Sequence, residues 1–221
     1  MFDLAETDRL LATTRSVRRR LDLERPVERD VVLDCIRLAV QAPTGGNAQG
    51  WRWLVIDDQE TKHALGELYQ RMATRYLGSY RSGQTTEQTT RVLDSADYLA
   101  TVLGRVPVLV VPCIKGRLAD TSPVSAASFY GSIIPAVWSF QLALRSRGLG
   151  SCFTTLHLAH EAEARDLLGI PDDITQTALL PVAYTTGGEF SPAERGPVEH
   201  ITYWNRWKDP RPDPAGTPGD R

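Results

Sequence analysis

The chain has 221 residues, with 25 lysines and arginines against 27 aspartates and glutamates and a formal net charge of −2. A nucleic-acid-binding protein normally carries a broad positive excess, so this balance argues against that class. The apolar share of 42% is sufficient for a packed core, and the longest apolar runs fall far short of the roughly 20 residues that span a bilayer.

The chain has three cysteines, Cys35, Cys113 and Cys152. An odd count without paired spacing predicts reduced thiols, which are typical of a cytoplasmic protein. The N-terminal stretch MFDLAETDRL contains no apolar signal core. We therefore expect a cytoplasmic protein without a membrane span.

The first 12 residues are predicted to form a short amphipathic helix, whose apolar members are Phe2, Leu4, Leu10 and Leu11. The stretch TTRSVRRR follows at residues 13–20 and carries Arg15, Arg18, Arg19 and Arg20. Such a cluster either faces an anion or forms a solvated face. Because the guanidinium fork grips phosphate through two N–H groups, the phosphate of a small molecule is the anion that the overall charge favours.

A second helix is predicted for residues 28–42, where apolar side chains recur at helical spacing. It ends at Pro43, which a helix does not readily accommodate. The loop within APTGGNAQGWRW has two glycines that free the backbone, and it projects Asn47 and Gln49. This loop is able to approach a flat ligand with amide groups, although an ordinary helix-to-strand turn has the same composition.

Residues 51–57, WRWLVID, are dense in aromatic and β-branched side chains and are predicted to form a strand. A polar helix is expected at residues 60–76. Residues 78–90 have no periodicity and many Thr, Gln and Ser side chains, so we expect a loop or mobile lid there. The continuous apolar run at residues 105–114 indicates a central buried strand.

The segment ADTSPVSAAS is expected to form a loop. The helix predicted next, in YGSIIPAVWSFQLALRSRG, has Pro135 in its first turn and Gly148 at its C-terminal cap. Its apolar face consists of Ile133, Val137, Phe140 and Leu144. A helix in EAEARDLLG and a strand at residues 177–184 follow.

Helices and strands interleave without regular βαβ alternation, which predicts an α+β sheet domain rather than a doubly wound fold. We expect one domain over residues 1–207. The segment from residue 208 to 221 is rich in proline and glycine and is predicted to be a disordered tail.

Several common catalytic motifs are absent from the sequence. GLGSCF begins like a dinucleotide fingerprint but lacks its last glycine and follows a helix. There is neither a Walker phosphate loop nor a GxSxG elbow. His157 and His160 are expected to be hydrogen-bonded residues at a helix start rather than metal ligands. Cys152 has no recognisable base beside it, so a nucleophilic thiol is not expected.

Four segments together resemble the FMN-dependent nitroreductase family over residues 10–207. They are RSVR, APTGGNAQGW, GLGSCFTTL and LLGIPDD, in this order and spacing. The resemblance implies a small mixed sheet wrapped by helices and an intertwined homodimer. It also implies two FMN molecules at the subunit interface.

The resemblance implies that the FMN phosphate and ribityl chain are held by Arg15, Ser16 and Arg18. A loop of the partner subunit is expected to complete the site, and its counterparts here are Pro43, Thr44, Gly45 and Asn47, with Gln49 beside them. Arg195 stands where the family supplies a late basic contact to the phosphate. Arg19 and Arg20 match nothing invariant in the motif and are expected to be solvated. The sequence departs from the family pattern at Thr14, Thr44 and Gly50.

The segment FTTL falls where the family contacts flavin O4 and N5, through Thr154, Thr155 and Leu156. It is also similar to the threonine-rich form of iodotyrosine deiodinases. The resemblance makes Thr154 and Thr155 equal candidates for the hydroxyl that tunes the cofactor, whereas a threonine pair that merely starts a strand is the structural alternative. The resemblance places the contacts to flavin N3, O2 and N1 around residues 69–81, where the sequence offers Gln70, Arg71, Arg75 and Arg81 as candidates without selecting among them. YWNRW resembles the family's C-terminal arm, which packs across the dimer.

The resemblance thus implies an FMN-dependent oxidoreductase that carries electrons from NAD(P)H to nitroaromatics, quinones or similar acceptors by a ping-pong mechanism. No side-chain acid or base is required, because the cofactor carries the chemistry. Reductive dehalogenation or flavin fragmentation on the same cofactor remains an alternative. A protein that only sequesters flavin is another.

Overall fold

The computed structural model describes residues 2–81 and 86–208, so the tail expected at the C-terminus lies outside the described residues except for Lys208. The α-helices are α1 (Leu4–Thr13), α2 (Arg29–Ala39), α3 (Gln59–Arg81), α4 (Glu87–Val102), α5 (Pro123–Gly131), α6 (Ile134–Arg145) and α7 (Glu161–Leu168). The strands are β1 (Trp51–Ile56), β2 (Val108–Lys115), β3 (Leu149–Ser151), β4 (Ile174–Gln176) and β5 (Leu180–Tyr184). Short 3-10 turns are η1 (Gly45–Asn47), η2 (Leu103–Arg105), η3 (Leu156–His160) and η4 (Val198–Ile201).

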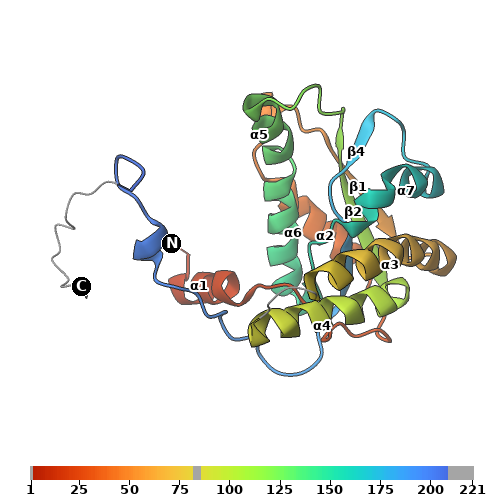
Figure 1. Cartoon of the computed structure of the whole chain (residues 1–221), viewed down its shortest axis with the longest axis horizontal. Helices are drawn as coiled ribbons and strands as arrows, with labels where there is room; N and C mark the ends of the chain where they lie inside the picture. The colour runs from red at the N-terminus through yellow and green to blue at the C-terminus, as the bar shows by residue number, and fades with distance from the viewer. Residues whose placement is uncertain (1, 82–85, 209–221) are drawn as a thin grey trace.

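The strands form one sheet in the order β1-β2-β5-β3, and β4 also pairs with β2. The α+β class is confirmed, but all four pairings between these strands are antiparallel, whereas a mixed sheet was expected. Figure 1 shows the helices gathered around this sheet.

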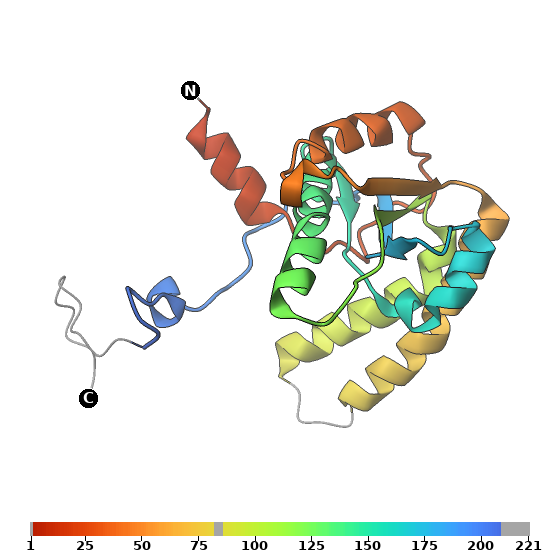
Figure 2. The same ribbon diagram turned by 90° about the horizontal axis from the view of Figure 1, so that it is seen from above.

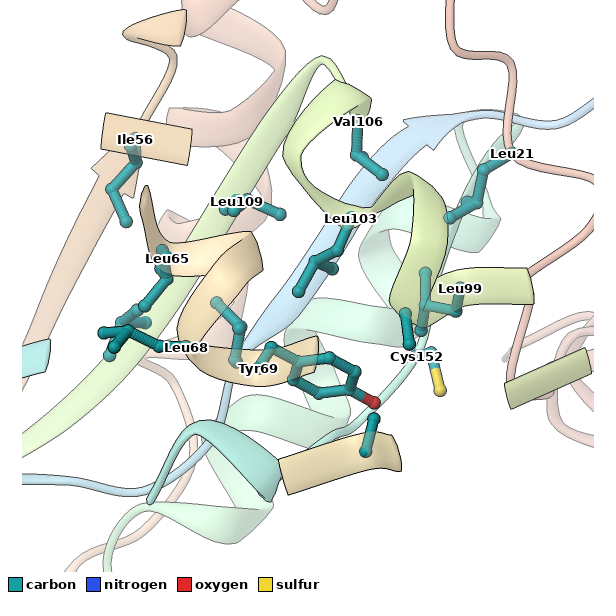
Figure 3. Close-up of a cluster of buried hydrophobic side chains, with 14 of the residues drawn as sticks. Leu21, Ile56, Leu65, Leu68, Tyr69, Leu99, Leu103, Val106, Leu109 and Cys152 are labelled. Atoms are coloured by element: carbon teal, nitrogen blue, oxygen red, sulfur yellow. The ribbon is translucent and has the colours of Figure 1, made fainter. Parts of the chain in front are cut away.

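Strand β2 is the centre of the core, as its continuous apolar run predicted. Alternate side chains of a strand point to opposite faces, and here Leu109 and Val111 join the cluster under α3 and α4. Val108 and Val110 join the cluster under α2 and α6. Figure 3 shows the first cluster, in which Leu109 lies between Leu65 of α3 and Leu103 of η2. Both faces of β2 are therefore buried.

Helix α6 buries the face that its spacing predicted, because Ile133, Val137, Phe140 and Leu144 have no exposed surface. The stretch Pro123–Arg145, which covers α5 and α6, is long and apolar enough to cross a membrane by length and composition alone, with a mean hydropathy of 1.2. The core helix of a soluble protein passes the same test. The buried face of α6 explains a large part of this apolar character.

The prediction of a loop at residues 78–90 is wrong outside residues 82–85, which lie beyond the described part of the chain. Helix α3 continues to Arg81, and α4 begins at Glu87. Thr86 caps α4 by accepting a hydrogen bond from the Thr89 amide over 3.1 Å. The polar helix ends carry too few apolar side chains to show periodicity, so their composition was read as a loop.

The prediction of a loop in ADTSPVSAAS is also wrong, because α5 begins within it. Ser122 caps this helix by accepting from the Ser125 amide, and Pro123 occupies its first turn. Both are ordinary helix-start signals. Strands β3 and β4 are too short for an alternating pattern to predict them.

Candidate flavin site on the N-terminal motif

The RSVR motif lies along the edge of the sheet, beside β3. The Val17 amide donates to the Ser151 carbonyl over 2.8 Å, and the Asp22 amide donates to the Tyr184 carbonyl over 2.8 Å. A Cβ added at Gly150 would lie 2.9 Å from Val17 Cβ, so only glycine permits this approach. Two predicted site segments, RSVR and GLGSCFTT, are thus fixed together.

A buried polar cluster joins these segments to α3. Its members are Arg18, Tyr69, Cys152 and Thr154. Burial raises the pKa of Tyr69 to about 12, and the Cys152 thiol raises it further, whereas the Arg18 charge and a hydrogen bond with Thr154 oppose the shift. Burial also raises the pKa of Cys152, against the Arg18 charge and hydrogen bonds from Ser16 and Arg18. Figure 3 shows the Tyr69 ring reaching from α3 toward Cys152. The raised pKa keeps the Cys152 thiol protonated, which disfavours a nucleophilic role.

The two threonines of FTTL differ in what their hydroxyls do. Thr154 is buried and its hydroxyl donates to the Leu179 carbonyl over 2.7 Å, while its backbone forms a bridge with the same residue. Thr155 is exposed, and its hydroxyl has no hydrogen-bond partner within residues 2–81 and 86–208. Leu156 is half-buried and begins η3. Only Thr155 therefore has a hydroxyl proton to offer to a ligand.

The arginines of TTRSVRRR have different surroundings. Arg15 and Ser16 are exposed, and Arg15 Nη1 donates to the Ser191 carbonyl over 3.2 Å. Arg18 is half-buried, with Nη1 3.4 Å from Ser95 Oγ on α4. Arg15 thus faces solvent, the exposed Ser16 hydrogen-bonds to the Cys152 thiol, and Arg18 points into the protein.

The expectation that Arg19 and Arg20 are merely solvated is wrong. Arg19 Nη2 donates to the Asp94 carbonyl over 3.1 Å, and its guanidinium lies 5.2 Å from the Tyr98 ring centre. Arg20 is half-buried and its Nε donates to the Thr186 carbonyl over 2.7 Å. Both arginines hold neighbouring elements in place, which is a tertiary role that the motif does not encode.

The PTGGN loop is docked on α5. The Gly45 amide donates to Ser132 Oγ over 2.9 Å, and a Cβ at Gly45 would lie 2.8 Å from Ser128 Oγ. Asn47 and Gln49 have φ values of 54° and 48°, in the left-handed region. Their side chains bond to each other over 2.9 Å, and Thr44 Oγ1 accepts from the Gln49 amide over 3.1 Å. Pro43 and the loop up to Gln49 are exposed except for the half-buried Thr44.

One chain does not bring this loop to the RSVR motif. The loop contacts Ser132, just before α6, whereas Arg145 at the end of α6 lies 3.5 Å from Thr13 Oγ1. The 12 residues of α6 make it about 18 Å long. Figure 1 shows the loop beside α5 and the N-terminal segment near the other end of α6. Asn47 and Arg15 are therefore separated by the length of this helix.

Within residues 2–81 and 86–208, Arg195 makes no hydrogen bond or ion pair with the motif. It is exposed on the C-terminal arm, residues 189–208, and its guanidinium donates to the Glu194 carbonyl over 3.0 Å. Figures 1 and 2 show this arm and α1 projecting from the body of the protein.

The structure separates the candidates on α3. Arg71 Nη2 lies 2.5 Å from Glu163 Oε2 on α7, so this side chain is paired away from the RSVR motif. Gln70 lines a hollow of about 710 Å³ between α3 and α7 and another of about 510 Å³ between α3 and α4. Arg75 is exposed, and the side chain of Arg81 lies outside the described part of the chain.

Sequence reasoning missed Tyr69, which links α3 to Thr154. Its spacing from Leu65 and Leu68 marks it as a core residue of the helix, and its hydroxyl needs a partner when buried. That requirement is the signal that points to it, although the partner is far away in the sequence.

The two histidines of HLAHE do not form a metal site. Within residues 2–81 and 86–208, no group of three His, Cys, Asp or Glu side chains is placed to hold a metal ion. His160 Nδ1 lies 3.0 Å from Glu163 Oε1, as expected for a hydrogen-bonded residue. For His157 that expectation is wrong, because it is fully buried and neither ring nitrogen has a partner. Burial lowers the pKa of His157 to about 4.

Comparisons with known proteins identify relatives over most of the chain. It is 30% identical to an iodotyrosine deiodinase of Thermotoga neapolitana, over 79% of this chain and 86% of that protein. It is 27% identical to an NADH dehydrogenase of Thermus thermophilus, over 86% and 91%. The matched region is only 55% of the iodotyrosine deiodinase of Drosophila melanogaster.

Solved structures show the same fold. An iodotyrosine deiodinase bound to FMN and 3-iodo-L-tyrosine superimposes with a TM-score of 0.67 at 23% identity, over 90% of this chain and 98% of that one. The sequence model of the Nitroreductase family matches residues 11–184, which is most of the chain. The chain therefore belongs to the nitroreductase family.

Proposed function

We propose that this protein is an FMN-dependent oxidoreductase that carries electrons from NAD(P)H to a small electron-poor acceptor. The observation that supports this most directly is the junction of RSVR with GLGSCFTT. The Val17–Ser151 hydrogen bond holds the arginines of the first segment beside the threonines of the second. The Thermus relative, named an NADH dehydrogenase, supports a nicotinamide as the reductant.

The residues at this junction fit FMN. Arg15 is exposed and uses one N–H on Ser191, so its remaining donors are free for a phosphate that needs charge-assisted hydrogen bonds. Ser16 is exposed beside it, and Arg18 adds a second positive charge from the buried side. When bound, FMN supplies hydride chemistry at N5, while the protein positions the ring and sets its electrostatics.

Thr155 is the hydroxyl that we assign to flavin N5 or O4. The proton of Thr154 is committed to Leu179, so Thr154 supports the backbone instead. Leu156 follows at the edge of the same site. The midpoint potential of bound FMN is expected to shift in Thr155→Val and to stay near the parent value in Thr154→Val, and the reverse pattern would exchange the two roles.

The other half of the site is proposed to come from a second copy of the chain. Pro43, Thr44, Gly45, Asn47 and Gln49 lie at the far end of α6 from Arg15, so in a two-fold dimer the loop of each copy serves the motif of the other. Exposed apolar side chains support such a partner, because a soluble monomer rarely exposes large apolar patches. They include Leu33, Leu38, Ile134, Trp138, Trp204 and Trp207.

The test begins with the visible spectrum of the purified protein and the identity of any released chromophore. We expect about one FMN per chain and NADH or NADPH oxidation with a quinone or nitroaromatic acceptor. Arg15→Ala and Arg195→Ala are expected to lower FMN content without unfolding the protein. Arg37→Ala, on the exposed part of α2, is the matched control.

Two outcomes contradict the proposal. Equal FMN content in Arg15→Ala, Arg195→Ala and the parent would remove the phosphate assignment. Bound FMN without any turnover would instead leave a protein that sequesters flavin. The three unpaired cysteines make the cytoplasm the proposed compartment.

Reductive dehalogenation is the second candidate, favoured by relatives that are named iodotyrosine deiodinases. The two reactions are separated by giving the reduced protein 3-iodotyrosine, menadione or a nitroaromatic in parallel. Release of iodide with poor quinone reduction selects the second candidate. Quinone or nitroaromatic reduction without iodide release selects the first.

A further inference from the structure

The C-terminal arm leaves the body through a short segment that arginines surround. This arm root, residues 186–191, receives Nε and Nη2 of Arg20 on the carbonyls of Thr186 and Gly188. Arg15 donates to the carbonyl of Ser191, the last residue of the root. The arm therefore starts from a defined position, although its later residues project from the body (Figure 2).

Phe190 lies at the centre of this arrangement. The guanidinium carbon of Arg20 is 3.8 Å from its ring centre, and that of Arg145 is 4.9 Å away. The Arg145 side chain is only 15% exposed, and its buried Nε has no hydrogen-bond partner. A cation packed on an aromatic ring is attracted more strongly when it is removed from water. The ring thus stabilises a buried charge that hydrogen bonds leave partly unsatisfied.

Glu189 completes the anchorage. Its Oε2 lies 3.4 Å from Arg145 Nη2 and 3.6 Å from Arg9 Nη1 of α1. Arg145 Nη2 is also 3.5 Å from Thr13 Oγ1, next to the RSVR motif. Arg145 consequently contacts both the end of α1 and the arm root.

We propose that Arg20 and Arg145, with Phe190 between them, are positioning residues that hold the arm root so that Arg195 is presented to the phosphate bound by Arg15. This inference rests on the proposed function. Arg195 is the fourth residue after Ser191, so the two Cα atoms are at most about 14 Å apart. Fixing the root therefore confines Arg195 to the neighbourhood of Arg15 and lowers the cost of ordering it when the phosphate binds.

The test compares Phe190→Leu with Phe190→Tyr in the full-length protein. Leucine keeps an apolar side chain but removes the ring, whereas tyrosine keeps the ring. Hydrogen exchange is measured at the Thr186 amide, which donates to the Arg20 carbonyl over 2.9 Å. The amides of β5 report whether the whole protein is destabilised.

Loss of two cation–π contacts is expected to speed exchange at Thr186 by about fivefold to thirtyfold in Phe190→Leu, and to raise the Kd for added FMN by a similar factor. Phe190→Tyr should match the parent in both measurements. Exchange in β5 should not change. If Phe190→Leu loosens β5 as well, Arg20→Gln removes the closer cation without shrinking the core and is expected to give the same two changes.

The outcomes separate the possible failures. Unchanged exchange at Thr186 in Phe190→Leu and Arg20→Gln would show that these residues do not hold the root. Faster exchange with an unchanged Kd would make the contact purely structural and overturn the positioning role. If the parent binds no FMN, the proposed function fails. The exchange measurement still decides whether Arg20, Arg145 and Phe190 hold the arm root.

Discussion

At the scale of single residues, His157 is a buried base without a partner, directly after the FTTL segment. Its ordinary pKa of 6.5 falls to about 4 because burial disfavours the charged ring. The unfolded chain therefore binds a proton below pH 6.5, whereas the folded chain does not until about pH 4. The free energy of unfolding that depends on this residue is fully present above pH 6.5 and is lost as the pH falls toward 4.

We predict that this one residue costs the protein about 3 kcal/mol of stability between these pH values. His157→Met removes the titrating group and should flatten this part of the pH dependence by that amount. Urea unfolding of parent and variant at several pH values from 7 to 4 measures the difference. Parallel curves for the two proteins would show that another group causes the acid sensitivity.

In the candidate site, residues within local sequence motifs were predictable, whereas residues defined by tertiary contacts were not. RSVR and FTTL were found from their local motifs, and the Val17–Ser151 bond joins the segments that contain them. Tyr69 was not found, because its partner Thr154 is remote in sequence and no local pattern pairs them. The sequence also does not tell which threonine hydroxyl is unpaired. That depends on a tertiary contact, because the Thr154 hydroxyl donates to the distant Leu179 carbonyl and the Thr155 hydroxyl does not.

At the scale of elements, Gly150 in β3 decides how closely the N-terminal segment packs on the sheet. An added Cβ would lie 2.7 Å from Thr185 Cγ2 and 2.9 Å from Val17 Cβ. Both neighbours are held by backbone hydrogen bonds, from Thr185 to Gly148 and from Val17 to Ser151, so they cannot yield without a shift of backbone.

Gly150→Ala is therefore predicted to destabilise the protein by about 1–3 kcal/mol, as overpacking generally does, and to weaken FMN binding by displacing RSVR. Gly78→Ala in α3 is the control, since nothing lies within 4 Å of its added Cβ. Alanine in that helix should gain about 0.5–1 kcal/mol. Chemical unfolding and FMN titration of both variants provide the measurements. Similar stability changes in the two variants would refute the packing argument.

Helices and strands were predictable from sequence where a long stretch of apolar residues followed one clear pattern. The apolar face of α6 and the continuous run of β2 identified both from sequence. The C-terminal turn of α3 and all of α4 were missed. Leu93 and Leu99 of α4 do join the core, but the polar side chains around them obscure the apolar spacing. The strands β3 and β4 are defined by pairing with distant strands, which a local pattern does not contain.

At the scale of the whole molecule, the exposed apolar side chains support the proposed dimer. Trp138 on α6 is 43% exposed and Ile134, one turn before it, is 45% exposed. Leu167 on α7 has a similar exposure of 40%, but α7 lies on the opposite side of the body from α5, α6 and the arm (Figure 1). Trp138 and Ile134 therefore mark the proposed interface, and Leu167 is an apolar residue of similar exposure outside it.

We predict that Trp138→Asp converts a dimer into a monomer and removes bound FMN, because an unpaired carboxylate would be buried in the interface. Leu167→Asp should remain dimeric and yellow. Sedimentation equilibrium, with absorbance at the flavin band, measures both properties together. A Trp138→Asp protein that stays dimeric with full FMN content would place the interface elsewhere.

The separation of the PTGGN loop from the RSVR motif by the length of α6 has a genetic consequence. If each site draws on both copies, a chain damaged in the motif and a chain damaged in the loop carry complementary lesions. Each would be inactive alone, yet a mixed dimer would contain one undamaged site beside one that carries both lesions. Co-expression of the two defective alleles should then restore activity that neither allele has by itself.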